Sequence, residues 1–141
     1  MPDSKMKIAQ QFAAALDVED YTTARALVSP ECVYDIGAAK LVGVDPIIDS
    51  YAKNGEQAKT RFDAIEYASR VEPTGSAAAV ITFTDRVCLA GKWHEYHCRQ
   101  HLSVNDAGFI TAIRHEEIPG ERDRLTAFER QQKQGSPGAS H

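Results

Sequence analysis

An acidic residue, Asp35, lies near the end of a short apolar segment, Cys32–Ile36, whose composition predicts a strand. A carboxylate beside apolar walls has a raised pKa and can accept a proton near neutral pH. The alternative is an aspartate at a strand end that caps a loop or faces water. From the residue types alone, this second interpretation is the more common one.

The segment from Trp93 to Val104 carries an unusual density of groups that can exchange or donate protons. In a strand, alternate side chains point to opposite faces. One face would carry His94, Tyr96, Cys98, Gln100, Leu102 and Val104. This face ends in apolar residues, so we expect it to line the core and a pocket. The opposite face is polar apart from Trp93, which predicts a solvated face or a homodimer interface.

The segment Phe109–Ile118 alternates in the same way, and it places Ile113, His115 and Glu117 on one side. Both sides are mixed, so alternation alone does not say which one faces inward. His115 facing a pocket would serve as an acid, a base or a donor, because its unperturbed pKa lies near neutrality. At a rim it would instead pair with Glu116 or Glu117.

A second carboxylate, Asp85, follows Ile81 and Phe83 in an alternating segment. Facing inward, Asp85 would raise the pKa of any close carboxylate. The interpretation that we prefer is a bulge near Arg86, with Asp85 paired in water to Arg86 or Lys92.

The sequence predicts neither a metal site nor a nucleotide cofactor. His94 and His97 have a spacing that resembles a ligand pair, but on a strand they face opposite sides. Arg99, which lies between His97 and His101, would repel a cation. Phosphate-binding glycine loops and the GxSxG pattern are absent from the sequence.

These residues are positioned by helices that come early in the chain and by strands that come late. We expect helices over residues 4–16, from Asp20 to about Pro30, from Asp45 to about Arg61, and over 121–133. We expect strands over 32–36, 62–72, 77–89, 92–104 and 109–118. The short breaks between the last four strands indicate antiparallel hairpins. This order favours an α+β fold, with a pocket between the sheet and the helices.

Composition is typical of one globular domain. The chain has 141 residues, of which 43% are hydrophobic, and a formal charge of -4 from 16 basic and 20 acidic residues. We expect one domain over 1–133 and a disordered tail over 134–141. The charge favours neither nucleic acid nor membrane binding, and no apolar run is long enough to cross a membrane. The three cysteines do not form a complete disulfide framework and, with no secretory signal, predict a cytoplasmic protein.

Four short motifs together resemble the nuclear transport factor 2-like superfamily, and within it the ketosteroid isomerase and SnoaL-like polyketide cyclase branches. They are Ala9–Leu16 before an acidic break, Val33–Asp35 leading to Gly43, Gln100–Asn105, and Gly108–Arg114. The resemblance covers about residues 5–120. It implies a cystatin-like, curved antiparallel sheet wrapped around N-terminal helices, which forms a cone-shaped pocket and commonly dimerises through its outer face.

The resemblance also implies roles for single residues. Ketosteroid isomerase is a known example of a carboxylate base that faces an oxyanion hole made by a tyrosine and a protonated aspartate. Asp35 matches the base, Phe12 replaces the oxyanion tyrosine, and Gln100 replaces the protonated aspartate. Tyr51 matches a supporting tyrosine, and the family alignment turns His115 and Glu117 inward. The catalytic residues that we predict are Asp35, Gln100 and His115.

We predict that the substrate contacts Phe12, Tyr51, Phe83, Tyr96, Cys98, Ile113 and Glu117. The expected function is a cofactor-independent pocket enzyme that removes a proton next to a carbonyl of a small hydrophobic substrate. It would be of the isomerase, cyclase or dehydratase type. The alternative is a non-catalytic module of the same fold for small-molecule binding or dimerisation, which the loss of the tyrosine at Phe12 favours. A weaker third interpretation is an epoxide hydrolase-like site.

Overall fold

The protein, for which we have a computed structural model, is described over residues 2–75 and 78–135. The elements in chain order are α1 (Pro2–Asp17), α2 (Tyr21–Ala26), β1 (Val28–Asp35), β2 (Lys40–Val42), α3 (Val44–Arg61), β3 (Ala64–Gly75), β4 (Ala78–Leu89), β5 (Lys92–Val104), β6 (Ile110–Glu117) and α4 (Glu121–Gly135). The predicted elements are present, and β2 is an addition. The second helix ends before Pro30, because Val28 already belongs to β1.

One curved sheet contains the six strands in the order β2-β1-β6-β5-β4-β3. Strands β3 to β6 form consecutive antiparallel hairpins, as predicted. The curved sheet that the resemblance implies is confirmed as antiparallel at every strand pair but one, because β1 runs parallel to β6. A tight turn forces antiparallel pairing. No such turn joins β1 to β6, so their direction depends on the whole chain path.

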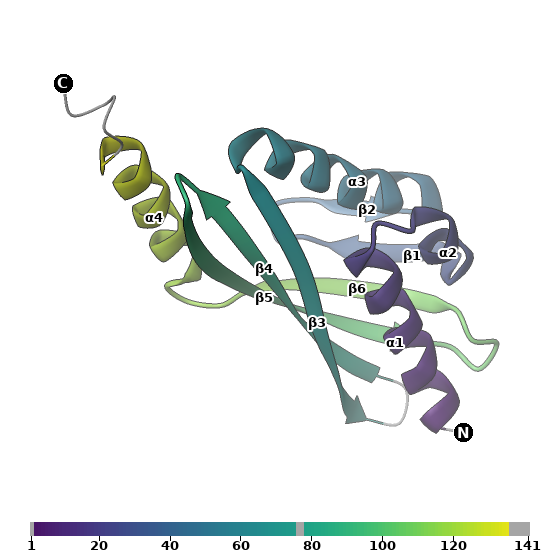
Figure 1. The fold of residues 1–141 in the computed structure, drawn as a ribbon. Helices are drawn as coiled ribbons and strands as arrows, with labels where there is room; N and C mark the ends of the chain where they lie inside the picture. Colours follow the sequence, from purple (N-terminus) through teal and green to yellow (C-terminus); the bar gives the residue numbers. More distant parts are fainter. Residues whose placement is uncertain (1, 76–77, 136–141) are drawn as a thin grey trace.

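Helices α1 and α3 cover the concave face of the sheet. Figure 1 shows α3 alongside β1 and β2, while α1 packs against β3. Helix α1 has an apolar face at helical spacing, and Ala9, Phe12 and Ala13 from this face are fully buried. They pack into a core that includes Ile81 and Leu102 from the long strands. The helices therefore fill one end of the concave face.

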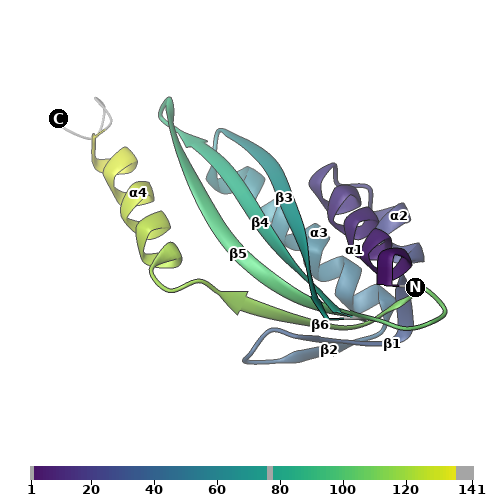
Figure 2. The ribbon, with the colours of Figure 1, turned by 90° about the horizontal axis from the view of Figure 1, so that it is seen from below.

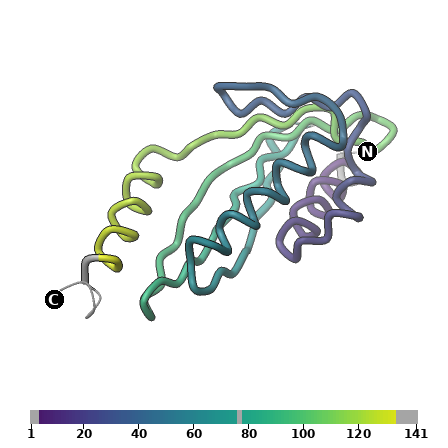
Figure 3. The backbone as a smooth tube through the Cα atoms, turned by 90° about the horizontal axis from the view of Figure 1, so that it is seen from above, coloured from purple at the N-terminus to yellow at the C-terminus, as the bar shows by residue number. Residues whose placement is uncertain are grey.

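Helix α4 lies at the other end of the sheet, far from α1 (Figures 2 and 3). Its buried residues Leu125 and Phe128 form a second cluster with Phe62, Val87 and Tyr96. An ion pair between Arg61 and Glu129 also joins α4 to the end of α3. Helix α4 thus contacts both the sheet and α3.

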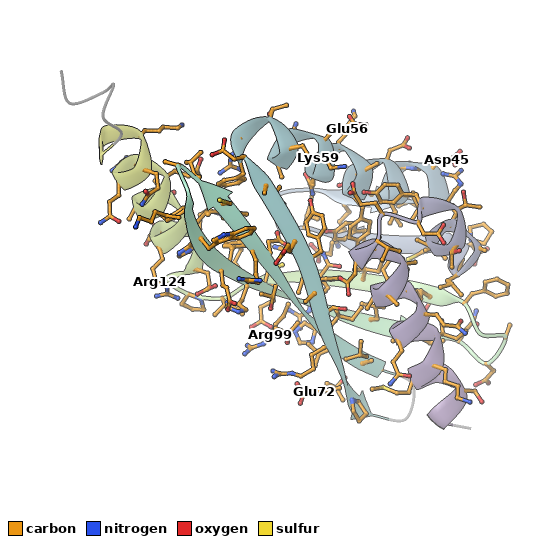
Figure 4. All side chains as sticks on the ribbon, viewed as in Figure 1. Asp45, Glu56, Lys59, Glu72, Arg99 and Arg124 are labelled. Carbon is orange, nitrogen blue, oxygen red and sulfur yellow. The ribbon has the colours of Figure 1, made fainter. Side chains whose placement is uncertain are left out.

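Helix α4 includes residues 134 and 135, which the sequence assigned to a disordered tail; the rest of that tail, 136–141, lies outside the described residues. Figure 4 shows Asp45 and Glu56 on the side of α3 away from the sheet. Within the described ranges, no helix is both long and apolar enough to cross a membrane.

Candidate functional site

A cavity of about 540 Å³ lies between the concave sheet face and helices α1, α3 and α4. This volume is within the range of small-molecule sites. Its aromatic lining residues are Tyr21, Tyr34, Tyr51, Phe62, Tyr67, Phe83 and Tyr96. Its polar and charged lining residues include Asp17, Glu19, Arg61, Asp85, Gln100, His115, Glu117 and Arg122. The lining is therefore rich in aromatic side chains, and its polar side chains are concentrated at separate places.

One cluster of polar residues, which we call the Gln100 network, consists of Tyr34, Tyr51, Gln100 and His115. The Tyr51 hydroxyl donates to Gln100 Oε1 over 2.5 Å, and Gln100 Nε2 donates to the Tyr34 hydroxyl over 2.8 Å. The Tyr34 and Tyr51 rings stack with centroids 5.4 Å apart. Burial raises the pKa of Tyr34 to about 12 and that of Tyr51 well above its usual 10. Both hydroxyls therefore stay protonated near neutral pH.

Gln100 also contacts His115, with Nε2 lying 3.3 Å from His115 Nδ1. When this amide donates to Nδ1, a neutral imidazole carries its hydrogen on Nε2, the nitrogen that lies 3.7 Å from Glu117 Oε1. Both amide hydrogens of Gln100 are then engaged with protein groups. Gln100 consequently orients Tyr34 and His115 rather than donating directly to a ligand.

A separate carboxylate, Asp85, lines the cavity from β4. Burial, with a smaller effect from the Asp17 carboxylate, raises the pKa of Asp85 to about 6, and His97 opposes this change. The Asp85 carboxylate makes no hydrogen bond or ion pair with another residue in 4–75 or 78–133. Asp85 is thus suited to accept a proton from a bound molecule near neutral pH.

Two residues from neighbouring elements lie close to Asp85. Tyr67 of β3 is its direct partner across the strand pair, and its hydroxyl is buried. Asp17, at the end of α1, accepts a hydrogen bond of 2.6 Å from the Ser69 hydroxyl. Burial raises the pKa of Asp17, and the Ser69 hydrogen bond opposes this. This part of the cavity wall is therefore acidic.

A third cluster of polar residues, after the Gln100 network and the acidic wall around Asp85, lies where α4 meets the cavity. Arg122 donates to Glu117 Oε1 over 2.8 Å, and the Tyr96 hydroxyl donates to Glu117 Oε2 over 3.1 Å. The hydrogen bond from Arg122 lowers the pKa of Glu117. Cys98 lies nearby in the wall, and burial raises the pKa of its thiol to about 12. A neutral thiol is a poor nucleophile, so Cys98 serves as an apolar wall residue.

The structure corrects the predicted position of Asp35. Cys32 and Tyr34 are buried on the inner face of β1, so Asp35 between Tyr34 and Ile36 faces the other way. Asp35 is not among the cavity-lining residues, and its Oδ1 accepts a hydrogen bond of 2.9 Å from the Gly37 amide. The family match placed Asp35 one residue out of phase with the strand alternation. The inward residue at this level is Tyr34.

Two residues predicted to contact substrate lie in the core instead. Phe12 is fully buried behind Tyr51, with ring centroids 5.7 Å apart. Ile113 is also buried in the core, and neither residue lines the cavity. Of the other predicted site residues, the lining includes Tyr51, Phe83, Tyr96, Cys98, Gln100, His115 and Glu117.

The preferred interpretation of Asp85 as a water-exposed partner of Arg86 is also wrong. Arg86 lies on the outer sheet face, where it bonds Glu66 and approaches Glu95 within 3.5 Å. The strand continues without a bulge at Asp85, which pairs with Tyr96 of β5. Alternation from Ile81 and Phe83 was therefore the correct signal for Asp85. Tyr67, Asp17 and Arg122 were missed, because their approach depends on how β3, α1 and α4 pack.

The outer face of the sheet holds His97 and His101 of β5, whereas His94 stacks on Phe128 of α4 with ring centroids 5.0 Å apart. His97 Nδ1 donates to Glu121 Oε1 over 2.9 Å, and His101 Nε2 lies 2.7 Å from Glu116 Oε1. A second hollow of about 390 Å³ lies beside His97 and Arg99. Figure 4 shows Arg99 and Glu72 directed away from α1 and α3. These groups do not share the large cavity with Asp85.

No family model matches the sequence, and no curated protein matches it either. Solved structures do share its fold. An NTF2-like protein of unknown function from Cytophaga hutchinsonii is 13% identical, with a TM-score of 0.60 over 86% of this chain and 94% of that one. An LEH-like epoxide hydrolase from M. tuberculosis is 17% identical, with a TM-score of 0.64 over 86% and 84%. A protein proposed to be a polyketide cyclase, from Xanthomonas campestris pv. campestris, is 12% identical, with a TM-score of 0.64 over 92% and 96%.

Proposed function

Starting from the nuclear transport factor 2-like fold of this chain, we propose that it is a cofactor-independent enzyme that removes a proton next to a carbonyl. The observation that carries the proposal is the Asp85 carboxylate, whose pKa of about 6 is set by burial in a cavity wall. A base works best when its pKa is close to the working pH. The aromatic lining suits a small hydrophobic substrate.

In the proposed reaction, the ionised Asp85 carboxylate takes a proton from the carbon beside the carbonyl group. The electron pair of the broken C–H bond forms the C=C bond of an enolate, and the carbonyl electron pair moves to oxygen. If the substrate carries a C=C bond next to the carbon that loses the proton, the enolate is a dienolate, and protonated Asp85 can return the proton to the far end of that bond while the carbonyl re-forms, which is an isomerisation. The same enolate can instead attack a carbon within the substrate or expel a leaving group, so cyclisation and dehydration begin with this step.

The Gln100 network supplies the polar contacts for the substrate at the other side of the cavity. In this proposal the Tyr34 hydroxyl and His115 Nε2 are the groups that reach the ligand, while Gln100 and Tyr51 hold them in place. Substrate contacts also come from Phe83, Tyr96 and Cys98 in the wall. No step in the reaction requires a metal or an organic cofactor.

The experiment that tests the proposal uses hydrogen exchange, because the substrate is unidentified. A panel of small cyclic ketones and enones is incubated with the protein in D2O, and deuterium uptake beside the carbonyl is followed by proton NMR. Asp85→Asn should slow the protein-dependent exchange by about a hundredfold or more. Asp35→Asn, which changes an aspartate that faces away from the cavity, should leave it within about twofold. Equal exchange by the Asp85→Asn variant would refute the assignment of the base.

A second candidate function is a binding module without catalysis. The observation that favours it is the Gln100 network, in which both amide hydrogens of Gln100 have protein partners. Such a preformed polar surface also suits simple ligand binding. This function would be indicated if ligands bind in the cavity and none of the panel gains deuterium.

We also propose a homodimer through the outer face of β3 to β6, in the cytoplasm. Trp93 on this face is 46% exposed, and the Arg86 guanidinium lies 5.1 Å from its ring centroid. Exposed tryptophan and arginine are enriched at protein interfaces. The cytoplasmic assignment is supported by the three free cysteines.

A further inference from the structure

The Tyr67 hydroxyl is a buried polar atom that has no hydrogen-bond partner among the described residues. Tyr67 belongs to β3, and its side chain lines the large cavity. Leaving a buried donor unpaired costs free energy, so such a group calls for an explanation. A ligand oxygen in the cavity would satisfy this donor.

Tyr67 lies directly beside the proposed base. It pairs with Asp85 across the β3–β4 ladder, and residues paired in this way have Cβ atoms about 5 Å apart on the same face. Both side chains line the cavity. A donor and a proton acceptor that have no side-chain partner among the described residues therefore extend from neighbouring positions on one cavity wall, with the Tyr67 hydroxyl directed toward Gly55 of α3, where an added Cβ would lie 4.0 Å from it.

The Gln100 network is farther from the base. Asp85 pairs with Tyr96, and Gln100 is four residues farther along β5. At about 3.4 Å per residue, this separation is about 14 Å along the strand. The carbon that loses the proton and the oxygen that gains the charge are separated by a single carbon atom in a simple enolate. One substrate carbonyl is thus within reach of Asp85 and Tyr67 together, while the Gln100 network contacts another part of the molecule.

We propose that Tyr67 is a catalytic residue that donates its hydroxyl hydrogen bond to the substrate oxygen on which the enolate charge develops. This inference rests on the proposed function of Asp85 as the base. Burial, and then the Asp85 carboxylate, raise the pKa of Tyr67 to about 12, so the hydroxyl keeps its hydrogen at neutral pH. The Tyr67 hydrogen is shared with the oxygen and not transferred, and the substrate proton goes to Asp85.

The test uses 4-nitrophenol as a mimic of the enolate, because its ring carries one oxygen that can hold negative charge. Binding is measured by titration at pH 7 for the unsubstituted protein and for Tyr67→Phe. Loss of one hydrogen bond to an oxygen of this kind should weaken binding about tenfold. The same variant should slow deuterium uptake by any active ketone about a hundredfold, as removal of an oxyanion donor does.

Thermal unfolding separates this role from a structural one. Tyr67→Phe removes a hydroxyl without a protein partner, so the melting temperature should stay the same or rise. Tyr51→Phe is the matched control for stability, because it removes a hydroxyl that donates to Gln100, and its melting temperature should fall.

Three results would overturn the inference: no binding of 4-nitrophenol by the unsubstituted protein, unchanged affinity in Tyr67→Phe, or a loss of stability in Tyr67→Phe as large as that in Tyr51→Phe. Failure of this inference differs from failure of the proposed function. If Asp85→Asn is inactive and Tyr67→Phe is fully active, Asp85 is the base and Tyr67 is not the donor. If Asp85→Asn is active, the proposed function itself fails.

Discussion

Replacement of Asp85 by asparagine should make the folded protein more stable at neutral pH. The folded state holds the pKa of Asp85 at about 6, against an ordinary value of 3.8, mainly because the carboxylate is buried. Above pH 6 the carboxylate is ionised in both the folded and the unfolded chain, and burial then penalises the folded state. Asparagine has nearly the same shape and carries no charge, so it removes this penalty.

The size of the effect follows from the two pKa values. Their difference is about two pH units, and each corresponds to 1.36 kcal/mol, so the penalty above pH 7 is about 3 kcal/mol. The size of the penalty depends on pH. Well below pH 3.8 the carboxyl group is protonated in both states and the penalty vanishes, and at pH 4.5 it is about 1 kcal/mol. The gain from Asp85→Asn should therefore shrink as the pH falls.

The assay is urea unfolding of both proteins at pH 7.5 and pH 4.5, followed by circular dichroism. The stability gained by Asp85→Asn should be about 2 kcal/mol larger at pH 7.5 than at pH 4.5. Asp35→Asn, at a carboxylate outside the cavity, provides the control for a general effect of charge removal. Destabilisation by Asp85→Asn at pH 7.5, or a gain that does not change with pH, would refute the argument that Asp85 is desolvated.

Three further predictions concern the core, the polar network and assembly. Phe12→Ala should lower the free energy of unfolding in urea by about 3–5 kcal/mol, because Phe12 is a fully buried core residue. A loss below about 1 kcal/mol would contradict its place in the core and favour the predicted position in the cavity wall. Gln100→Leu should lower the free energy of unfolding by about 2–4 kcal/mol in the same assay, because it removes the partner of the Tyr34 and Tyr51 hydroxyls. An unchanged free energy of unfolding would contradict the Gln100 network. Sedimentation should show a dimer that Trp93→Glu weakens, and a monomer mass at every concentration would exclude the homodimer.

Much of the fold was predictable from local patterns. Alternation over 92–104 places Tyr96, Gln100 and Leu102 on the buried face, as the structure confirms. Short turns between the long strands predict the hairpins, because a tight turn allows only antiparallel pairing. The parallel contact of β1 with β6 was not predictable in this way, since no local turn joins them.

The candidate site was predictable where its residues belong to one strand, and less so elsewhere. His115 and Glu117 line the cavity as expected. Asp35 was misplaced because a short motif match outweighed the two-residue period of β1, in which Cys32 and Tyr34 face inward. Asp85 was visible in the alternation of β4, but a pairing with its charged neighbour Arg86 was preferred.

The amino-acid sequence by itself determined the order of helices and strands, the hairpins and the residues on each face of the long strands, because periodicity and turn chemistry are local. Only the tertiary structure decided that Tyr67, Asp85 and Asp17 meet in one cavity wall. Their proximity depends on the register of β3 against β4 and on where α1 packs against the sheet. The raised pKa of Asp85 likewise comes from burial and from the carboxylate of Asp17, sixty-eight positions away in the sequence, so no local pattern contains it.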